Sequence, residues 1–255
     1  MQLIGMIHLP PLPGSPRFGG SMNAVLDHAM NDAQVLIDAG FDSLLIENYG
    51  DIPFYKEHVP PHTISAMTVA AHEIRRSFDV QFGVQVLRND AIAALAIAEA
   101  AGASFIRVNV LSGAMLTDQG IIESNAAEVL RYRSMIAPEI KIWADVHVKH
   151  AMPLVPLSIE DAAMELAERA CADAIIVSGS ATGKETLLED VKRVKSVVNI
   201  PVVIGSGVTE ENVHQYIPFA DALIIGTSIK KDGVPTNPVD EERAERLVKK
   251  VKSSR

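Results

Sequence analysis

The sequence contains a single cysteine, Cys171, among its 255 residues. An intramolecular disulfide is therefore excluded, and one free thiol is typical of a protein from a reducing compartment. Long hydrophobic runs are also missing. The opening apolar stretch, residues 3–9, has no basic leader and is far shorter than the roughly 20 residues that a membrane-spanning helix needs. We therefore expect a cytoplasmic protein without a transmembrane segment.

Aromatic residues and positive charge are both scarce. Aromatic residues make up 5% of the chain and hydrophobic residues 48%, so the core must be built mainly from Ala, Val, Ile and Leu, as in parallel strands buried on both faces. The formal net charge of −9 repels nucleic acids and anionic lipid surfaces. A nucleic-acid partner is therefore not expected. A small anionic ligand is compatible with this charge, because backbone amides bind anions locally.

Short apolar or β-branched runs recur along the chain, each followed by a polar loop and a longer segment of helical periodicity. This alternation predicts a parallel sheet with helical crossovers. The predicted strands are residues 3–7, 43–46, 81–85, 105–109, 141–147, 174–177, 202–204 and 222–225. Eight strands in a chain close to the roughly 250 residues of a typical one-domain barrel predict a single (β/α)8 TIM barrel over residues 1–255. The oligomeric state stays open, a homo-oligomer included.

Several residues predict where helices begin and end. Ser158 followed by Asp161 resembles a capping box, and Asn237 before a proline is typical of a helix start. Gly40 and Gly102 stand where helices should end before the second and fourth strands. The long loops, residues 10–20, 48–61, 111–120 and 150–157, all follow strand C-termini. That face of a barrel carries the chemistry of barrel enzymes.

Polar side chains gather at the predicted mouth of the barrel. Side chains alternate along a strand, so Asp145 and His147 are expected to point the same way, as are Arg107 and Asn109 on the neighbouring strand. The ring is completed by residues that end the first three strands, His8, Glu47 and Gln85. Ionisable groups at a barrel mouth favour a ligand site. The alternative is an internal salt bridge, such as Arg107 with Asp145, that only closes the barrel.

These side chains predict acid–base chemistry. His147 would act as general acid or base, Asp145 would orient it, and Arg107 would stabilise developing negative charge. His8 and Glu47 are further catalytic candidates, although a single histidine at a strand end is often a hydrogen-bonded packing residue. Substrate hydroxyl groups would be positioned by Glu47, Gln85 and Asn109. No cofactor is required, while a divalent metal stays open because this set includes metal-ligand types without a compact signature.

The last three predicted strands end in small residues, which predict a phosphate site. Small residues let the backbone approach an anion, and the N-termini of following helices offer unpaired N–H groups. Barrel phosphate sites are frequently built by the loops after the seventh and eighth strands. The alternative is that these residues only form tight turns. The predicted phosphate-binding residues are Gly179, Gly205, Ser206, Gly207, Gly226 and Thr227.

Four segments resemble the BtpA family: residues 5–16, 118–120, 144–147 and 205–208. The resemblance covers nearly the full chain, and the opening motif is specific to this family. It implies a barrel of the ribulose-phosphate-binding type. The best-known member of the family is a factor needed for photosystem I accumulation in cyanobacteria, and the family brings no settled chemistry with it.

The residues together favour an enzyme, a lyase, isomerase or transferase that acts on a small phosphorylated metabolite such as a sugar phosphate. The sequence leaves the substrate and the bond changed open. The resemblance implies a different class of function, a non-catalytic assembly or stability factor for photosystem I. We favour the enzyme, because a polar barrel mouth and phosphate loops would have no use in a pure scaffold.

Overall fold

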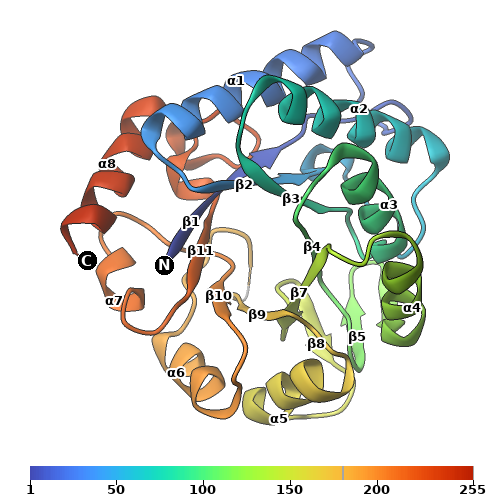
Figure 1. The fold of residues 1–255 in the computed structure, drawn as a ribbon, viewed down its shortest axis with the longest axis vertical. Helices are drawn as coiled ribbons and strands as arrows, with labels where there is room; N and C mark the ends of the chain where they lie inside the picture. The colour runs from blue at the N-terminus through green and yellow to red at the C-terminus, as the bar shows by residue number, and fades with distance from the viewer. Residues whose placement is uncertain (180, 255) are drawn as a thin grey trace.

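The computed structural model describes residues 1–179 and 181–254, which form a closed barrel of parallel strands with helices around it (Figure 1). The barrel strands are β1 (Gln2–His8), β2 (Ser43–Glu47), β3 (Gln81–Gln85), β4 (Phe105–Val108), β7 (Lys141–Val146), β9 (Ala174–Val177), β10 (Val202–Ile204) and β11 (Ala222–Ile225). They pair in chain order, and β1 closes the barrel against β11. The predicted (β/α)8 barrel is confirmed, and each predicted strand is present.

Helices connect the strands on the outside of the barrel (Figure 1). The α-helices are α1 (Met22–Ala39), α2 (Pro61–Ser77), α3 (Ala91–Ala101), α4 (Ala126–Ile136), α5 (Ile159–Met164), α6 (Leu188–Val197), α7 (Val213–Tyr216) and α8 (Glu241–Ser253). Short 3-10 turns cover Tyr49–Asp51, Thr227–Ile229 and Lys231–Gly233, and α5 continues into a π-helical turn, Glu165–Arg169. No helix in the described residues is long and apolar enough to cross a membrane.

Three of the four predicted helix ends are confirmed. Gly40 and Gly102 end α1 and α3 in the left-handed conformation, which glycine adopts without steric cost. The Ser158 hydroxyl accepts the amide N–H of Asp161 at the start of α5. The predicted helix start at Asn237 is wrong, because its side chain donates to the carbonyl oxygen of Lys231 and closes a turn. The N-cap of α8 is instead Asp240.

An apolar layer fills the inside of the barrel below its mouth. Its members are Ile4, Met6, Leu45, Phe105, Ala174, Ile176, Val203, Ala222 and Ile224, with Trp143 packed against them. The rings of Phe105 and Trp143 are stacked with their centroids 4.0 Å apart. This layer is a packed core of the kind that fills barrels of eight strands. Polar side chains at the strand ends consequently lie above an apolar floor.

A small antiparallel sheet, which the sequence did not predict, lies beside the barrel mouth. Its strands are β5 (Ala114–Thr117), β6 (Gly120–Glu123) and β8 (Ala151–Pro153), in the order β6-β5-β8. They come from the long loops after β4 and β7, which pair with each other. Beneath the sheet lies a separate apolar cluster, Val110, Met115, Ile122 and Val148. The sheet therefore fixes the segment that leaves β7.

Candidate functional site

A cavity of about 760 Å³ opens at the carboxyl ends of the barrel strands. Its lining includes polar residues that end the first four strands, namely His8, Glu47, Gln85, Arg107 and Asn109. Small residues at the ends of β10 and β11 also line it, namely Gly205, Ser206, Gly207, Gly226 and Thr227. Two groups of residues that the sequence predicted separately are thus brought together in one cavity.

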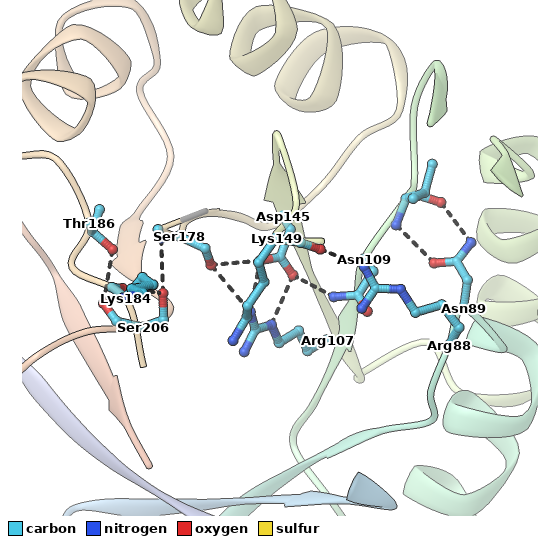
Figure 2. Close-up of polar contacts among 12 residues, drawn as sticks. Arg88, Asn89, Arg107, Asn109, Asp145, Lys149, Ser178, Lys184, Thr186 and Ser206 are labelled. Atoms are coloured by element: carbon cyan, nitrogen blue, oxygen red, sulfur yellow. Dashed lines mark hydrogen bonds and ion pairs between the residues drawn. The ribbon is translucent and has the colours of Figure 1, made fainter. Parts of the chain in front are cut away.

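The buried ion pair of Arg107 and Asp145 lies at the base of this cavity. Arg107 Nε and Nη2 each donate to one oxygen of Asp145 at 2.8 Å. Asn109 Nδ2 donates to Asp145 Oδ2 at 3.0 Å and Ser178 Oγ donates to Oδ1 at 3.0 Å, from opposite sides of the pair (Figure 2). Burial raises the pKa of Asp145, but the charge and hydrogen bonds of Arg107 outweigh it and hold the pKa below its usual value. Asp145 therefore stays ionised and positions Arg107.

His147 is not where strand alternation places it. Strand β7 ends at Val146, and His147 has a φ of 48°, so the alternation stops one residue before it. Its side chain is not among the described residues that line the cavity. Burial lowers its pKa, and the nearest charges that act on it are Asp190 and Arg193 of α6, outside the barrel. The expected arrangement, with His147 beside Asp145 at the mouth, is wrong.

His8 is held at the cavity wall as a neutral imidazole. Its Nδ1 lies 2.7 Å from the carbonyl oxygen of Pro235, and because a carbonyl can only accept, Nδ1 carries the hydrogen. The ring stacks on Tyr49 with centroids 4.6 Å apart. Burial and the charge of Lys230 lower the pKa of His8 to about 3. At neutral pH, Nε2 is consequently unprotonated and able to accept a hydrogen bond.

Glu47 reaches the same cavity from the end of β2. Burial raises its pKa, although the positive charges of Lys149, Arg107 and Arg88 oppose the shift. Its side chain forms no hydrogen bond or ion pair with another described residue. A buried carboxyl group with a raised pKa that is not used by the fold is suited to proton transfer.

Two cationic residues in the cavity, Arg88 and Lys149, were missed by the sequence analysis. Arg88 follows the end of β3 and donates from Nη2 to the carbonyl oxygen of Lys149 at 2.6 Å. Burial, followed by the charge of Arg107, lowers the pKa of Lys149 to about 8. Their positions in the sequence could have indicated them. Each lies three residues beyond the last residue of a barrel strand, Gln85 for Arg88 and Val146 for Lys149.

Three residues that line this cavity carry buried polar atoms without a partner in the described part of the chain. Gln85 Oε1 and Asn109 Oδ1 are buried acceptors without a donor among the described residues, and Arg88 Nε is a buried donor without an acceptor there. All three residues line the cavity. Buried polar atoms in native proteins nearly always have a hydrogen-bond partner. These atoms are therefore available to a ligand or to water.

The loop after β10 presents backbone amides to the cavity. Thr186 Oγ1 donates to the carbonyl oxygen of Ser206 at 2.9 Å, and Asn212 Nδ2 donates to that of Gly207 at 2.9 Å. The amide N–H groups of Ser206 and Gly207 have no acceptor in the described part of the chain. The adjacent wall of the cavity is formed by the segment after β11, where a 3-10 turn begins at Thr227, directly after Gly226. The first N–H groups of such a turn have no partner within it.

Two of the predicted phosphate residues have structural uses instead. The amide N–H of Gly179 donates to Ser206 Oγ at 2.9 Å, and Gly179 does not line the cavity. The amide of Gly205 donates to the carbonyl oxygen of Val177 at 2.8 Å.

A third predicted phosphate residue, Gly207, has a φ of 71°, and a Cβ atom there would overlap the carbonyl oxygen of Lys184. Glycine is therefore needed at position 207 for the loop to close, whatever it binds.

No group of three or more His, Cys, Asp or Glu side chains in residues 1–179 and 181–254 is arranged to hold a metal ion. Of the four carboxylate and imidazole side chains predicted at the barrel mouth, Asp145 is bound to Arg107 and His147 lies outside the cavity. Glu47 and His8 remain at its wall.

Comparison with known proteins places the chain among close relatives. A model of the BtpA family matches residues 1–253. The photosystem I biogenesis protein BtpA of Synechocystis is 44% identical over 247 residues, covering 96% of this chain and 86% of that protein. An uncharacterized protein of Methanocaldococcus jannaschii is 46% identical over 246 residues, covering 96% and 93%.

Solved structures that are similar to this chain share its fold. Phosphoribosyl anthranilate isomerase from Thermus thermophilus has a TM-score of 0.62 at 14% sequence identity, covering 100% of both chains. Thiamine phosphate pyrophosphorylase from Pyrococcus furiosus has a TM-score of 0.61 at 14% identity, covering 99% of this chain and 96% of that one. At this level of identity the likeness extends to the (β/α)8 architecture alone.

Proposed function

Since the chain belongs to the BtpA family, we propose, from that membership and the geometry of its cavity, that it is an enzyme acting on a small phosphorylated metabolite. One observation carries the proposal: the same cavity holds unbonded backbone amides on one wall and buried ionisable groups with shifted pKa values on another. The amides suit an anion that does not react, and the ionisable groups suit proton transfer beside it.

The phosphate group would lie between the loop after β10 and the turn after β11. Ser206, Gly207 and Thr227 would donate backbone N–H groups to its oxygens. Gly226 would leave room for it, because a glycine there keeps a methyl group out of the space next to Met6 and His8. Two structurally similar barrels are named after phosphorylated compounds, thiamine phosphate and phosphoribosyl anthranilate. This agrees with a phosphate site in a barrel of this fold.

The reacting carbon would lie near the barrel axis, above the apolar floor. Glu47 would exchange a proton with it, and His8 would accept a hydrogen bond at Nε2. Arg107, fixed by Asp145, would stabilise negative charge that develops on an oxygen. Gln85 and Asn109 would accept hydrogen bonds from substrate hydroxyl groups. A lyase, isomerase or transferase reaction fits this set of groups.

A non-catalytic assembly or stability factor is the alternative, and the Synechocystis relative, by its name a photosystem I biogenesis protein, favours it. A scaffold, however, has no use for buried acceptors that face an open cavity. An exposed apolar surface would carry such a role, and Met152, Leu154 and Val155 offer a small one at β8. Loss of photosystem binding on changing these side chains, with the cavity intact, would support this alternative.

Calorimetric titration with ribose 5-phosphate and with ribose tests the proposal. We expect binding of the phosphate ester to be at least about tenfold tighter, since each tenfold is about 1.4 kcal/mol and several amide hydrogen bonds contribute. Gly226→Ala should weaken it, because the new methyl group would take up space beside Met6 and His8 that the ester needs. Gly19→Ala is the matched control, since a Cβ atom there meets nothing within 4 Å. Equal affinity for ribose and ribose 5-phosphate would argue against the site.

A further inference from the structure

We propose that Lys149 is a nucleophile that forms an imine with the carbonyl carbon of a phosphorylated hydroxy-aldehyde or hydroxy-ketone. This inference rests on the proposed function, because the phosphate and the carbonyl group would occupy the same cavity. It names a class of substrate and a covalent step for that cavity.

The backbone of Lys149 is held from both sides. Its carbonyl oxygen accepts a hydrogen bond from Arg88. Val148, before it, is buried in the apolar cluster under the small sheet. Ala151, two residues after it, pairs with Thr117 across β8 and β5. The side chain of Lys149 lines the cavity, so its direction is set by a rigid segment.

The amino group of Lys149 is not used by the fold. Its Nζ atom forms no hydrogen bond and no ion pair with another residue in the described part of the chain. Of the two carboxylates that act on Lys149, Glu47 and Asp145, Asp145 is already saturated by hydrogen bonds from Arg107, Asn109 and Ser178. Figure 2 shows Lys149 next to this saturated pair. A lysine that is directed into a cavity without a partner is available for chemistry.

The charges around Lys149 favour the neutral amine. Arg107 and Arg88 oppose a third positive charge, while Glu47 and Asp145 favour it. Burial and Arg107 prevail, and the pKa of Lys149 falls to about 8. Compared with an ordinary lysine, the neutral fraction at pH 7.5 rises on the order of a hundredfold. Desolvation beside another cation is a recognised way to activate a lysine.

Imine formation balances with the groups present. The Nζ lone pair attacks the carbonyl carbon, a C–N bond forms, and the amine proton moves to the former carbonyl oxygen. The Glu47 carboxyl group, whose pKa burial raises, gives a proton in its acid form to this hydroxyl group, which leaves as water while the C=N bond forms. The products are a protonated imine, water and the Glu47 carboxylate.

The protonated imine would draw electrons from a neighbouring bond. A proton can then leave the adjacent carbon, with the C–H electron pair moving toward nitrogen and the Glu47 carboxylate accepting the proton. Alternatively, the bond from that carbon to a hydroxyl-bearing carbon breaks, with the C–C electron pair moving toward nitrogen. In that case the Glu47 carboxylate accepts the hydroxyl proton, and the fragment leaves as an aldehyde. Gln85 Oε1 and Asn109 Oδ1, buried without donors in the described residues, would accept hydrogen bonds from hydroxyl groups on the same molecule. Phosphate, hydroxyl and carbonyl groups together define the substrate class.

Borohydride trapping tests the inference on the full chain. The protein is incubated with dihydroxyacetone phosphate at pH 7.5, reduced with sodium borohydride, and mapped by peptide mass spectrometry. We expect a stable adduct on Lys149, at least about tenfold more abundant than on Lys141, whose side chain is 61% exposed. The yield at Lys149 should rise with pH to half its maximum near pH 8. Lys149→Arg should keep the positive charge but lose the adduct.

The outcomes separate this inference from the proposed function. If dihydroxyacetone phosphate binds but Lys149 is labelled no more than Lys141, the imine is overturned and phosphate binding stands. If unphosphorylated dihydroxyacetone labels Lys149 equally well, the lysine is supported and the phosphate site is overturned. Absence of both binding and labelling contradicts both. Should Lys149→Arg fail to fold, the ratio of Lys149 to Lys141 labelling in the unaltered protein still decides.

Discussion

Arg107 and Asp145 form a two-point ion pair across the neighbouring strands β4 and β7, with both N···O distances at 2.8 Å. The side chains are 1% and 0% exposed, and Arg107 also lines the cavity. The sequence left two interpretations open, an internal salt bridge and a ligand site. The pair agrees with both, since it is an internal salt bridge and Arg107 is part of the candidate site. What it does not do is orient His147.

Removing one partner of this pair should destabilise the fold strongly. Asp145→Asn leaves the Arg107 guanidinium buried without its counter-charge, which typically costs about 3–5 kcal/mol. Urea denaturation at pH 7 measures the change in free energy of unfolding. Glu160→Gln, at the exposed ion pair with Arg193, is the control and should change it little. Equal effects of the two substitutions would contradict the role of Asp145.

The stability of the protein should fall as the pH is lowered from about 6.5 toward 3, in part because of His8. Its pKa is about 3 in the folded state and 6.5 as a model value, so in this range the unfolded chain binds a proton that the folded chain does not. The contribution approaches 1.4 kcal/mol per pH unit. His8→Gln should flatten the slope measured by urea denaturation between pH 4.5 and 6.5. His72 on α2 is exposed, so His72→Gln is the control. If His8→Gln leaves the slope of stability against pH unchanged, the His8 ring is not buried in its neutral form.

His147→Ala should leave ligand binding unchanged. The side chain lies outside the cavity, against the charges of α6, so its removal takes nothing from the site. Calorimetric titration with ribose 5-phosphate and borohydride labelling of Lys149 measure the two properties. If the variant melts at the same temperature as the unaltered protein but loses either property by tenfold or more, His147 is part of the site.

Gly207→Ala should lower the melting temperature more than Gly19→Ala does. The backbone at Gly207 is left-handed and its Cα faces the carbonyl oxygen of Lys184. A residue with a side chain held in such a conformation costs on the order of 1–3 kcal/mol. Thermal unfolding of the two variants side by side measures the difference. If both melt alike, the loop after β10 is looser than the structure shows.

The barrel was predictable because its signals are local. Runs such as Ala174–Val177 and Ala222–Ile225 have the predicted bounds, since parallel strands buried on both faces leave unbroken apolar segments. The sheet β6-β5-β8 was not predictable in this way. Its strands come from two loops far apart in the chain, and pairing between them leaves no local pattern.

The candidate site was predicted in part for a similar reason. Alternation along a strand placed Arg107 and Asp145 correctly, because both lie within regular strands. It failed at His147, where a φ of 48° follows the last strand residue. The same change of direction brings Lys149 to the cavity in place of His147. A backbone turn of this kind at a non-glycine residue cannot be predicted from strand periodicity.

The most direct test of the central claim is a crystal structure of the protein with ribose 5-phosphate. The account predicts a phosphate group at the barrel mouth, with oxygens about 2.7–3.2 Å from the backbone nitrogens of Ser206, Gly207 and Thr227. Its sugar carbons should point toward Glu47 and Lys149. A cavity that stays free of the ester at saturating concentration, or a phosphate bound elsewhere on the molecule, would contradict the account.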